Sequence, residues 1–218
     1  QFGLDQPVYI LTSDRTFSAA EEYTFDLKNL KRATIVDDTT GVGGHTVAGY
    51  AFDFDGFRMA IRVPHGRAYN PENNEGWEGV GVVPHIAVPE EQALDAAHAH
   101  ALRALIEAEK DEGVVAGYRW ALTDLESRLN PIKLSAKELK QYVGKYGPRR
   151  IVIENGVLYY QREDRPRYEM APMGGELFRV GDLDYFRLAF ERDKSGKVVK
   201  LIGQYNDGRT DENEREKG

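Results

Sequence analysis

The hydrophobic pattern near the start of the chain predicts a strand, a helix and a second strand. Val8 to Leu11 is a short apolar run, as in a buried strand. Apolar residues then recur at spacings of three and four from near Ser18 to Lys31, which predicts a helix. We expect its buried face to consist of Ala19, Ala20, Tyr23, Leu27 and Leu30. Because Ala33 to Val36 is again strand-like, the unit predicts a parallel sheet with a crossover helix.

A glycine-rich loop and a hairpin follow. Thr39 to Gly44 contains three glycines, and two strand-like runs come after it, Ala48 to Phe54 and Phe57 to Val63. The Asp55-Gly56 pair between these runs suits a tight hairpin turn. The polar stretch from residue 64 to residue 76 predicts a loop.

Helical periodicity returns between residues 90 and 129. Glu90 to about Glu112 predicts one amphipathic helix, with Gly113 as its C-terminal cap. Its predicted buried face is Leu94, Ala97, Ala101, Leu105 and Ala108. Tyr118 to Leu129 predicts a second helix, which Pro131 ends.

The pattern changes to short alternating strands after residue 131. Ser135 and Glu138 have the spacing of a capping box at the start of a short helix. Asn155-Gly156, between two strand-like runs, marks a hairpin. Further runs of this type predict an antiparallel meander or small barrel: 177–180, 185–190 and 198–205.

These patterns divide the chain into four parts. We expect an α/β unit at 1–112, a helical linker at 113–133, a β-rich domain at 134–209 and a disordered polar tail at 210–218.

Composition excludes several functions. Of the 218 residues, 41% are hydrophobic, and the formal net charge is −7, which argues against nucleic acid as the main partner. There is no cysteine, which excludes disulfides and cysteine catalysis and leaves the compartment open. No apolar run approaches the roughly 18 residues of a membrane span.

The candidate chemistry lies at Ser18, where a strand has ended and a helix begins. The first amides of a helix have no partners and the helix dipole is positive there, so an oxyanion would be stabilised. Ala19 and Ala20 are small and would let a substrate carbonyl approach. Serine is also among the commonest helix caps, so position alone favours a plain cap over a nucleophile.

Five ordered blocks between Pro7 and Leu94 resemble the tail-specific (C-terminal-processing) serine protease family. They are similar to the branch that contains the tricorn protease core and the interphotoreceptor retinoid-binding protein modules. The blocks are Val8–Ser13, Thr16–Glu21, Lys31–Val36, Gly41–Gly44 and Trp77–Ile86. The resemblance implies a crotonase/Clp-protease-like α/β fold. Residues 1–112 would then be the C-terminal part of the peptidase core.

The resemblance also implies roles for individual residues. Ser18 would be the nucleophile and the Ala19 amide an oxyanion donor. Glu78 falls in the block that carries a catalytic Glu in the tricorn-like branch. We assign Gly41, Gly43 and Gly44 to the oxyanion or substrate loop.

The general base is not assigned by the resemblance. The Lys of the bacterial processing proteases would fall at about Gly43, so a Ser–Lys mechanism is not expected. In the tricorn-like branch a His from upstream of the nucleophile is the base, together with a second Ser. His45, beside the glycine-rich loop, is the local alternative. The loop lacks the ending of a P-loop, and no metal or other cofactor is expected.

The implied function is serine-type proteolysis by acyl transfer on peptides or unfolded proteins. We expect the chain to be a fragment of a longer enzyme, inactive until joined to the missing upstream part. A homo-oligomer is compatible with this reading, and a periplasmic or secreted location is favoured. The alternative is a non-catalytic module that binds a hydrophobic ligand or a peptide on the same fold.

The β-rich region resembles a domain found at the C-terminal end of bacterial hydrolases. Seven of its aromatic side chains could line a ligand cavity, although core packing is the commoner role. They are Tyr159, Tyr160, Tyr168, Phe178, Tyr185, Phe186 and Phe190.

Overall fold

The structure, a computed structural model, describes residues 6–216. The chain forms two compact units, Gln1–Ala101 and Leu102–Gly218. No helix among residues 6–216 is long and apolar enough to cross a membrane.

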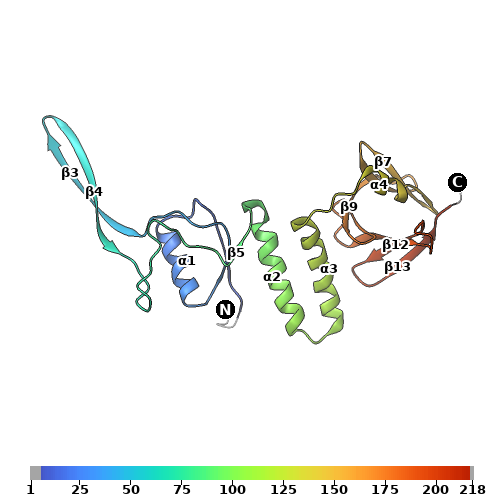
Figure 1. Ribbon diagram of the computed structural model, residues 1–218, viewed down its shortest axis with the longest axis horizontal. Helices are drawn as coiled ribbons and strands as arrows, with labels where there is room; N and C mark the ends of the chain where they lie inside the picture. The colour runs from blue at the N-terminus through green and yellow to red at the C-terminus, as the bar shows by residue number, and fades with distance from the viewer. Residues whose placement is uncertain (1–5, 217–218) are drawn as a thin grey trace. The chain divides into compact units, whose positions relative to one another are not determined.

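The N-terminal unit is built on the predicted parallel sheet (Figure 1). β1 (Tyr9–Thr12) pairs with β2 (Thr34–Asp37), and β2 pairs with the short β5 (Ile86–Ala87). Helix α1 (Ala19–Asn29) connects β1 to β2. The strand–helix–strand prediction is therefore confirmed, with a shorter helix than expected.

The buried face of α1 differs from the prediction. Tyr23 and Leu30 are 60% and 74% exposed, whereas Glu21 and Thr24 are fully buried. Apolar periodicity marks an apolar face but not the side that meets the sheet. Here the buried side of α1 carries the Glu21 carboxylate, which has its own hydrogen-bond partners. A charged group can be buried when its hydrogen bonds are satisfied in this way.

The predicted hairpin forms a separate two-stranded sheet and is longer than expected (Figure 1). β3 (His45–Phe54) pairs with β4 (Phe57–Arg67), so the loop predicted from residue 64 begins only after residue 67. Asp55 and Gly56 both have positive φ, 43° and 79°, as a type I′ turn requires.

One face of this hairpin is apolar and exposed. Tyr50 pairs with Ile61 and Phe52 with Met59, and all four side chains are at least 47% exposed. Alternate positions on the other face include the pair Asp53–Arg58. Strict alternation therefore creates an amphipathic ribbon whose apolar side has no cover within the described chain.

The helices after β5 have different bounds from those predicted. The short 3-10 helix η1 (Glu90–Gln92) leads into α2 (Ala93–Ala108). Asp111 then caps α3 (Glu112–Leu129) by accepting hydrogen bonds from the Gly113 and Val114 amides, so Gly113 does not end a helix.

The predicted face of α2 is also mostly wrong. Leu94 and Leu105 are 54% and 43% exposed, and Ala97 is the member of the predicted set that is buried. The buried side is formed by alanines, whose small side chains allow close backbone approach: Ala93, Ala96, Ala97 and Ala99.

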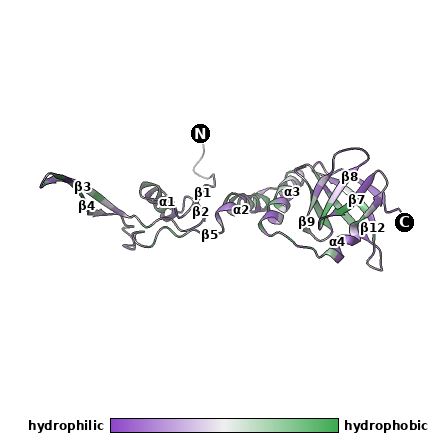
Figure 2. Cartoon of the chain, turned by 90° about the horizontal axis from the view of Figure 1, so that it is seen from above, coloured by the Kyte–Doolittle hydropathy of each residue, from purple (hydrophilic) through white to green (hydrophobic). Residues whose placement is uncertain are grey.

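The C-terminal unit contains the predicted meander as one eight-stranded antiparallel sheet in sequential order. Figure 2 colours this unit by hydropathy. Its strands are β6 (Gly144–Tyr146), β7 (Arg149–Glu154), β8 (Val157–Arg162), β9 (Tyr168–Gly174), β10 (Leu177–Val180), β11 (Phe186–Arg192), β12 (Val198–Tyr205) and β13 (Thr210–Glu214). The core within the sheet includes Tyr146, Phe178, Leu188 and Leu201, each 1% exposed or less.

The prediction of a disordered tail at 210–218 is wrong for the described residues. Thr210–Glu214 forms β13, which pairs with β12 along its whole length. Arg215 then bridges to Tyr146 of β6, and the Glu216 amide donates to the Lys145 carbonyl at 2.9 Å. A strand whose side chains largely face solvent needs few apolar residues, so the polar composition of this segment does not exclude a strand. The segment brings the last strand next to the first and nearly closes the barrel.

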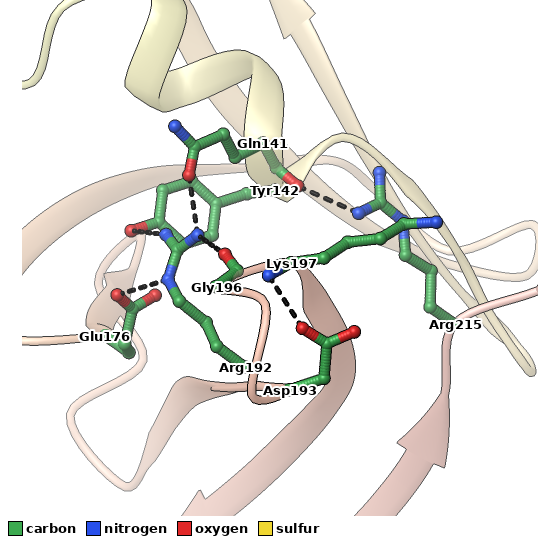
Figure 3. A network of polar contacts seen from close by, with 8 residues as sticks. All are labelled: Gln141, Tyr142, Glu176, Arg192, Asp193, Gly196, Lys197 and Arg215. Carbon is green, nitrogen blue, oxygen red and sulfur yellow. Dashed lines mark hydrogen bonds and ion pairs between the residues drawn. The ribbon is translucent and has the colours of Figure 1, made fainter.

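Helix α4 (Ala136–Tyr142) starts at the predicted capping box and is fixed to one end of the barrel (Figure 3). The Arg192 guanidinium donates to Gln141 Oε1 at 2.6 Å, to Tyr142 Oη at 3.2 Å and to Glu176 Oε1 at 2.8 Å. Leu139 and Tyr142 of α4 belong to the barrel core. The helix therefore plugs this end of the barrel.

Candidate active site

A tight turn after β1 places Ser18 at the start of α1. The Thr16 amide donates to the Ser13 carbonyl at 2.9 Å, and the Ser13 amide donates to Thr16 Oγ1 at 3.0 Å. Ser18 follows as the cap of α1, exposed, with φ 56° and ψ −120°. This is a strained conformation for a residue with a side chain, of the kind found where a strand-to-helix turn presents a nucleophile.

The Ser18 hydroxyl does not serve as an ordinary helix cap. Ser18 and Glu21 have the arrangement of a capping box, but the hydroxyl makes no capping hydrogen bond of ordinary geometry. The Glu21 carboxylate makes the other hydrogen bond of a capping box: the Ser18 amide donates to Glu21 Oε2 at 2.8 Å. The Ser18 backbone is therefore held by Glu21, while the residue itself is exposed.

Glu21 holds three segments together. Its Oε2 atom also accepts from the Gly43 amide at 3.1 Å, and its Oε1 atom accepts from Thr40 Oγ1 at 2.7 Å. Thr40 Oγ1 in turn accepts from the Val82 amide at 2.8 Å. Three accepted hydrogen bonds compensate for the complete burial of this carboxylate. Glu21 was not among the predicted site residues, although the S-x-x-E spacing from Ser18 is a capping-box signal.

The glycine-rich loop lies between the Ser18 turn and residues 77–79. The Gly41 amide donates to the Thr16 carbonyl at 2.8 Å, while the Gly79 amide donates to the Val42 carbonyl at 3.0 Å. One position in this loop requires glycine because of close backbone approach: a Cβ on Gly44 would lie 2.8 Å from the Glu78 backbone nitrogen.

The loop amides have partners inside the protein. The Gly41, Gly43 and Gly44 amides donate to Thr16, Glu21 and Glu78 respectively. By contrast, no acceptor within residues 6–216 binds the Ala19 amide, which is the first of α1. Among the predicted oxyanion donors, the Ala19 amide is therefore the one left free to meet a substrate oxygen.

His45 and Glu78 form a pair beside this loop. His45 Nδ1 lies 3.3 Å from Glu78 Oε1, and Glu78 Oε2 accepts from the Gly44 amide at 2.5 Å. Both side chains are partly exposed. The carboxylate can orient the imidazole and select its tautomer, as the third member of a catalytic triad does. No local feature of the sequence pairs these two residues, which lie 33 positions apart.

The other histidines lie elsewhere. His65 is exposed on β4, and His85 Nδ1 accepts from the Ile35 amide at 2.9 Å. His98 and His100 are exposed on α2, and His100 bonds the Tyr9 hydroxyl at 2.9 Å. Residues 6–216 contain no cluster of three or more His, Cys, Asp or Glu suited to a metal ion.

Asp37 is a second strained residue at the same edge of the sheet. It ends β2 with φ 108°, is 3% exposed, and its Oδ1 atom has no hydrogen-bond partner among residues 6–216. Burial raises the pKa of Asp37, and the nearby carboxylates of Glu90 and Asp38 raise it further. The edge of the sheet that carries the Ser18 turn thus also holds a buried carboxyl group with a raised pKa.

Comparison with known proteins identifies the family of the segment that contains this site. Residues 1–88 match the model of peptidase family S41.

The match to family S41 agrees with the peptidase resemblance of the sequence blocks at the level of the family, and we refer to residues 1–88 as the S41 segment. A similar solved structure is that of mature CPAF, with 24% sequence identity and a TM-score of 0.36. The similarity covers 40% of this chain and 17% of that chain, so the present chain matches only a small part of that protein's length.

Proposed function

We propose that the S41 segment supplies the nucleophile of a serine peptidase, and that this nucleophile is Ser18. The observation that carries the proposal is the strained, exposed Ser18 at the positive end of α1, with its amide fixed by buried Glu21. A plain cap needs no such strain, since Ser caps helices from ordinary extended backbone. Ser135 does so at α4, with φ −68° and ψ 158°.

The proposed reaction is acyl transfer. Ser18 Oγ attacks the carbonyl carbon of a peptide bond and loses its proton to a base. The tetrahedral oxyanion accepts a hydrogen bond from the Ala19 amide and is stabilised by the α1 dipole. The base returns the proton to the departing amine, and water then hydrolyses the acyl-enzyme by the same steps.

We propose the His45–Glu78 pair as the local candidate for the base. Its support is the 3.3 Å contact of His45 Nδ1 with Glu78, which leaves Nε2 available to accept a proton. The alternative is a His from outside these residues, as the tail-specific resemblance implies. If His45 is the base, His45→Gln lowers the acylation rate as strongly as Ser18→Ala does; an unchanged rate assigns the base elsewhere.

The finer assignments rest on the family. We propose a tail-specific protease of the tricorn-like branch with a crotonase-like core. It would act on peptides or unfolded proteins. We also propose that the protein forms a homo-oligomer and that further segments of the enzyme contribute to the active site.

The experiment is labelling of the full-length protein with a fluorophosphonate, which reacts with activated serine hydroxyls. We expect labelling of the wild type, and loss of labelling by a factor of about 10³ or more in Ser18→Ala. Ser195→Ala removes a hydroxyl in the other unit and should label normally. Equal labelling of the Ser18→Ala variant would refute the nucleophile assignment.

A second candidate function is a binding module for a hydrophobic ligand or peptide. The observation that favours it is the exposed apolar face of the β3–β4 hairpin, on which Phe54 and Phe57 are 65% and 72% exposed. Absence of fluorophosphonate labelling in the wild type, together with binding of a hydrophobic peptide that is lost in Phe57→Ser, would support this function instead.

A further inference from the structure

The two ends of the C-terminal barrel are built differently. In a sequential meander, successive loops lie at alternate ends of the sheet. The loops β7–β8, β9–β10 and β11–β12 share the end that α4 plugs, where Arg192 holds Gln141 and Tyr142. The loops β8–β9 and β10–β11 and the end of β12 lie at the opposite end. Helix α3 reaches this opposite end, where Trp120 Nε1 donates to the Asp184 carbonyl at 2.7 Å and the Arg187 guanidinium donates to the Trp120 carbonyl. Among residues 6–216, α4 is the helix that contributes side chains to the barrel core.

A cavity of about 180 Å³ opens at this second end. It lies between the β8–β9 loop, the β10–β11 loop and the end of β12. Its aromatic lining consists of Tyr160, Tyr168, Tyr185, Phe186 and Tyr205. Tyr160 and Phe186 have ring centroids 5.7 Å apart, and Phe186 and Tyr205 are 5.1 Å apart. The rings therefore offer both faces and edges to a planar ligand.

Two guanidinium groups, Arg162 and Arg165, complete the lining. Within residues 6–216, neither side chain has a hydrogen bond or an ion pair, and the Arg162 Nε atom is buried without a partner. An unpartnered buried donor on a charged group is costly unless a ligand or water satisfies it. No lining residue is a carboxylate.

The acids near this site have other partners or lie outside its lining. Asp211 is paired with buried Arg149, with 2.6 Å between Nη2 and Oδ2, accepts from Tyr205 Oη at 3.1 Å, and also interacts electrostatically with Arg162. Asp182 and Asp184 flank lining residue Leu183 but line a separate pocket with Asp124 and Arg128. Glu163 and Asp164, between the two arginines in the chain, are exposed and do not line the cavity. The lining itself is therefore aromatic, with two guanidinium groups.

We propose that this cavity, here named the barrel-mouth pocket, binds an aromatic ring that carries one carboxylate. The ring packs against Tyr160, Tyr168 and Phe186, and the carboxylate accepts hydrogen bonds from the Arg162 guanidinium. The volume suits a single ring with a short acidic arm, because pockets for drug-sized ligands are about 300–1,000 Å³. The ligand is a free aromatic acid or the C-terminal residue of a peptide.

The experiment measures binding of 3-phenylpropionate to the full chain by calorimetry or NMR titration. We expect a Kd of about 0.1–1 mM, as for a ligand of this size. Binding of the neutral 3-phenylpropanamide should be at least tenfold weaker. Higher salt should weaken binding of the acid and leave the amide unchanged.

Matched variants locate the site. Arg162→Gln should weaken binding of the acid at least tenfold. Arg150→Gln, at an exposed position of β7, should not change binding of the acid. Tyr185→Ala should weaken binding of both the acid and the amide. Tyr159→Ala removes a tyrosine of the same barrel outside the pocket lining and should change binding of neither compound. The wild-type comparison of acid and amide remains decisive if a variant fails to fold.

The source of the ligand follows from a second titration. If Ala-Ala-Phe with a free C-terminus binds at least as tightly as 3-phenylpropionate, the ligand is the C-terminal residue of a peptide. If the tripeptide binds more weakly, the ligand is a free aromatic acid. Equal binding of acid and amide, binding of inorganic phosphate as tightly as of the acid, or wild-type affinity in Arg162→Gln would each overturn the proposal. Because Ser18 takes no part, the result is independent of peptidase activity.

Discussion

The two units treat their apolar side chains in opposite ways. The barrel unit gathers 14 buried residues into one core, and its last strand returns to its first. The N-terminal unit keeps a three-stranded sheet and a separate hairpin, with Tyr23, Leu30 and Phe57 at least 60% exposed. An isolated two-stranded ribbon is marginal in water, so the hairpin gains stability from whatever covers its apolar face.

The difference shows where the chemistry of this protein can lie. A sheet that closes on itself satisfies its own edges and needs no partner. The strained residues Ser18 and Asp37 instead occur in the unit whose surfaces are left open. Strain persists where surrounding contacts fix it, here through Glu21, and it accumulates at functional sites.

The largest expected contrast comes from matched phenylalanines. Phe178→Ala empties a site that is 1% exposed in the barrel core and should cost about 3–5 kcal/mol of unfolding free energy. Phe57→Ala, at the hairpin tip, should change the unfolding free energy by less than about 0.5 kcal/mol. Segment-resolved hydrogen exchange measures each unit separately, which matters because two units need not unfold together.

A large loss of protection in the N-terminal unit of Phe57→Ala would break this contrast. It would mean that the hairpin face is buried in solution, against another surface.

The barrel closure can be tested at its buried charge. Asp211→Asn leaves Arg149, 1% exposed, without its counter-ion; we expect a loss of about 2–3 kcal/mol, reduced from the buried-pair value because Asp211 is partly exposed. Glu212→Gln, which breaks the exposed ion pair with Lys200, should cost less than about 1 kcal/mol.

The same pair predicts how the barrel responds to acid. Burial alone would raise the pKa of Asp211, but the hydrogen bond and charge of Arg149 outweigh it and lower the pKa. A lowered folded-state pKa gives stability that is complete above the unfolded pKa, about 3.9, and is lost as the pH falls further. Barrel stability should therefore drop below about pH 4 in the wild type and less steeply in Asp211→Asn, as measured by urea unfolding.

The smallest of these effects tests whether Glu21 positions Ser18. Glu21→Gln replaces one of the two acceptor oxygens by an amide donor, so the Ser18 amide, the Gly43 amide and the Thr40 hydroxyl can no longer all be satisfied as in the wild type, at a local cost of about 1–2 kcal/mol. It should also slow fluorophosphonate labelling, because Ser18 is no longer held in its strained conformation. Glu22→Gln, at the exposed neighbouring position, should leave both measurements unchanged. Equal effects of the two variants would show that Glu21 is not the positioning residue.

Local signals identified most elements and few of the buried faces. Asp55-Gly56, Asn155-Gly156 and the Ser135 capping box each depend on neighbouring residues alone, and all three predictions are confirmed. The faces of α1 and α2 depend on what packs against them, and those predictions were mostly wrong.

The candidate site shows the same division. Ser18 could be singled out because its position between strand and helix is local, and the S41 match supports the blocks around it. Glu21 could not be separated from an ordinary first-turn acid, because its hydrogen bonds run to Gly43 and Thr40, far away in the sequence. The pairing of His45 with Glu78 likewise depends on the glycine-rich loop returning beside residue 78.

The sequence by itself determined the strand–helix–strand unit, the hairpin, the meander and the placement of Ser18 at a helix start, since spacing, turn residues and caps act over a few residues. The tertiary structure alone decided that Glu21 is buried beneath the Ser18 turn, that residues 210–216 close the barrel, and that Arg162 lies unpaired among aromatic rings. Those outcomes depend on long-range contacts, which have no local signature in the chain.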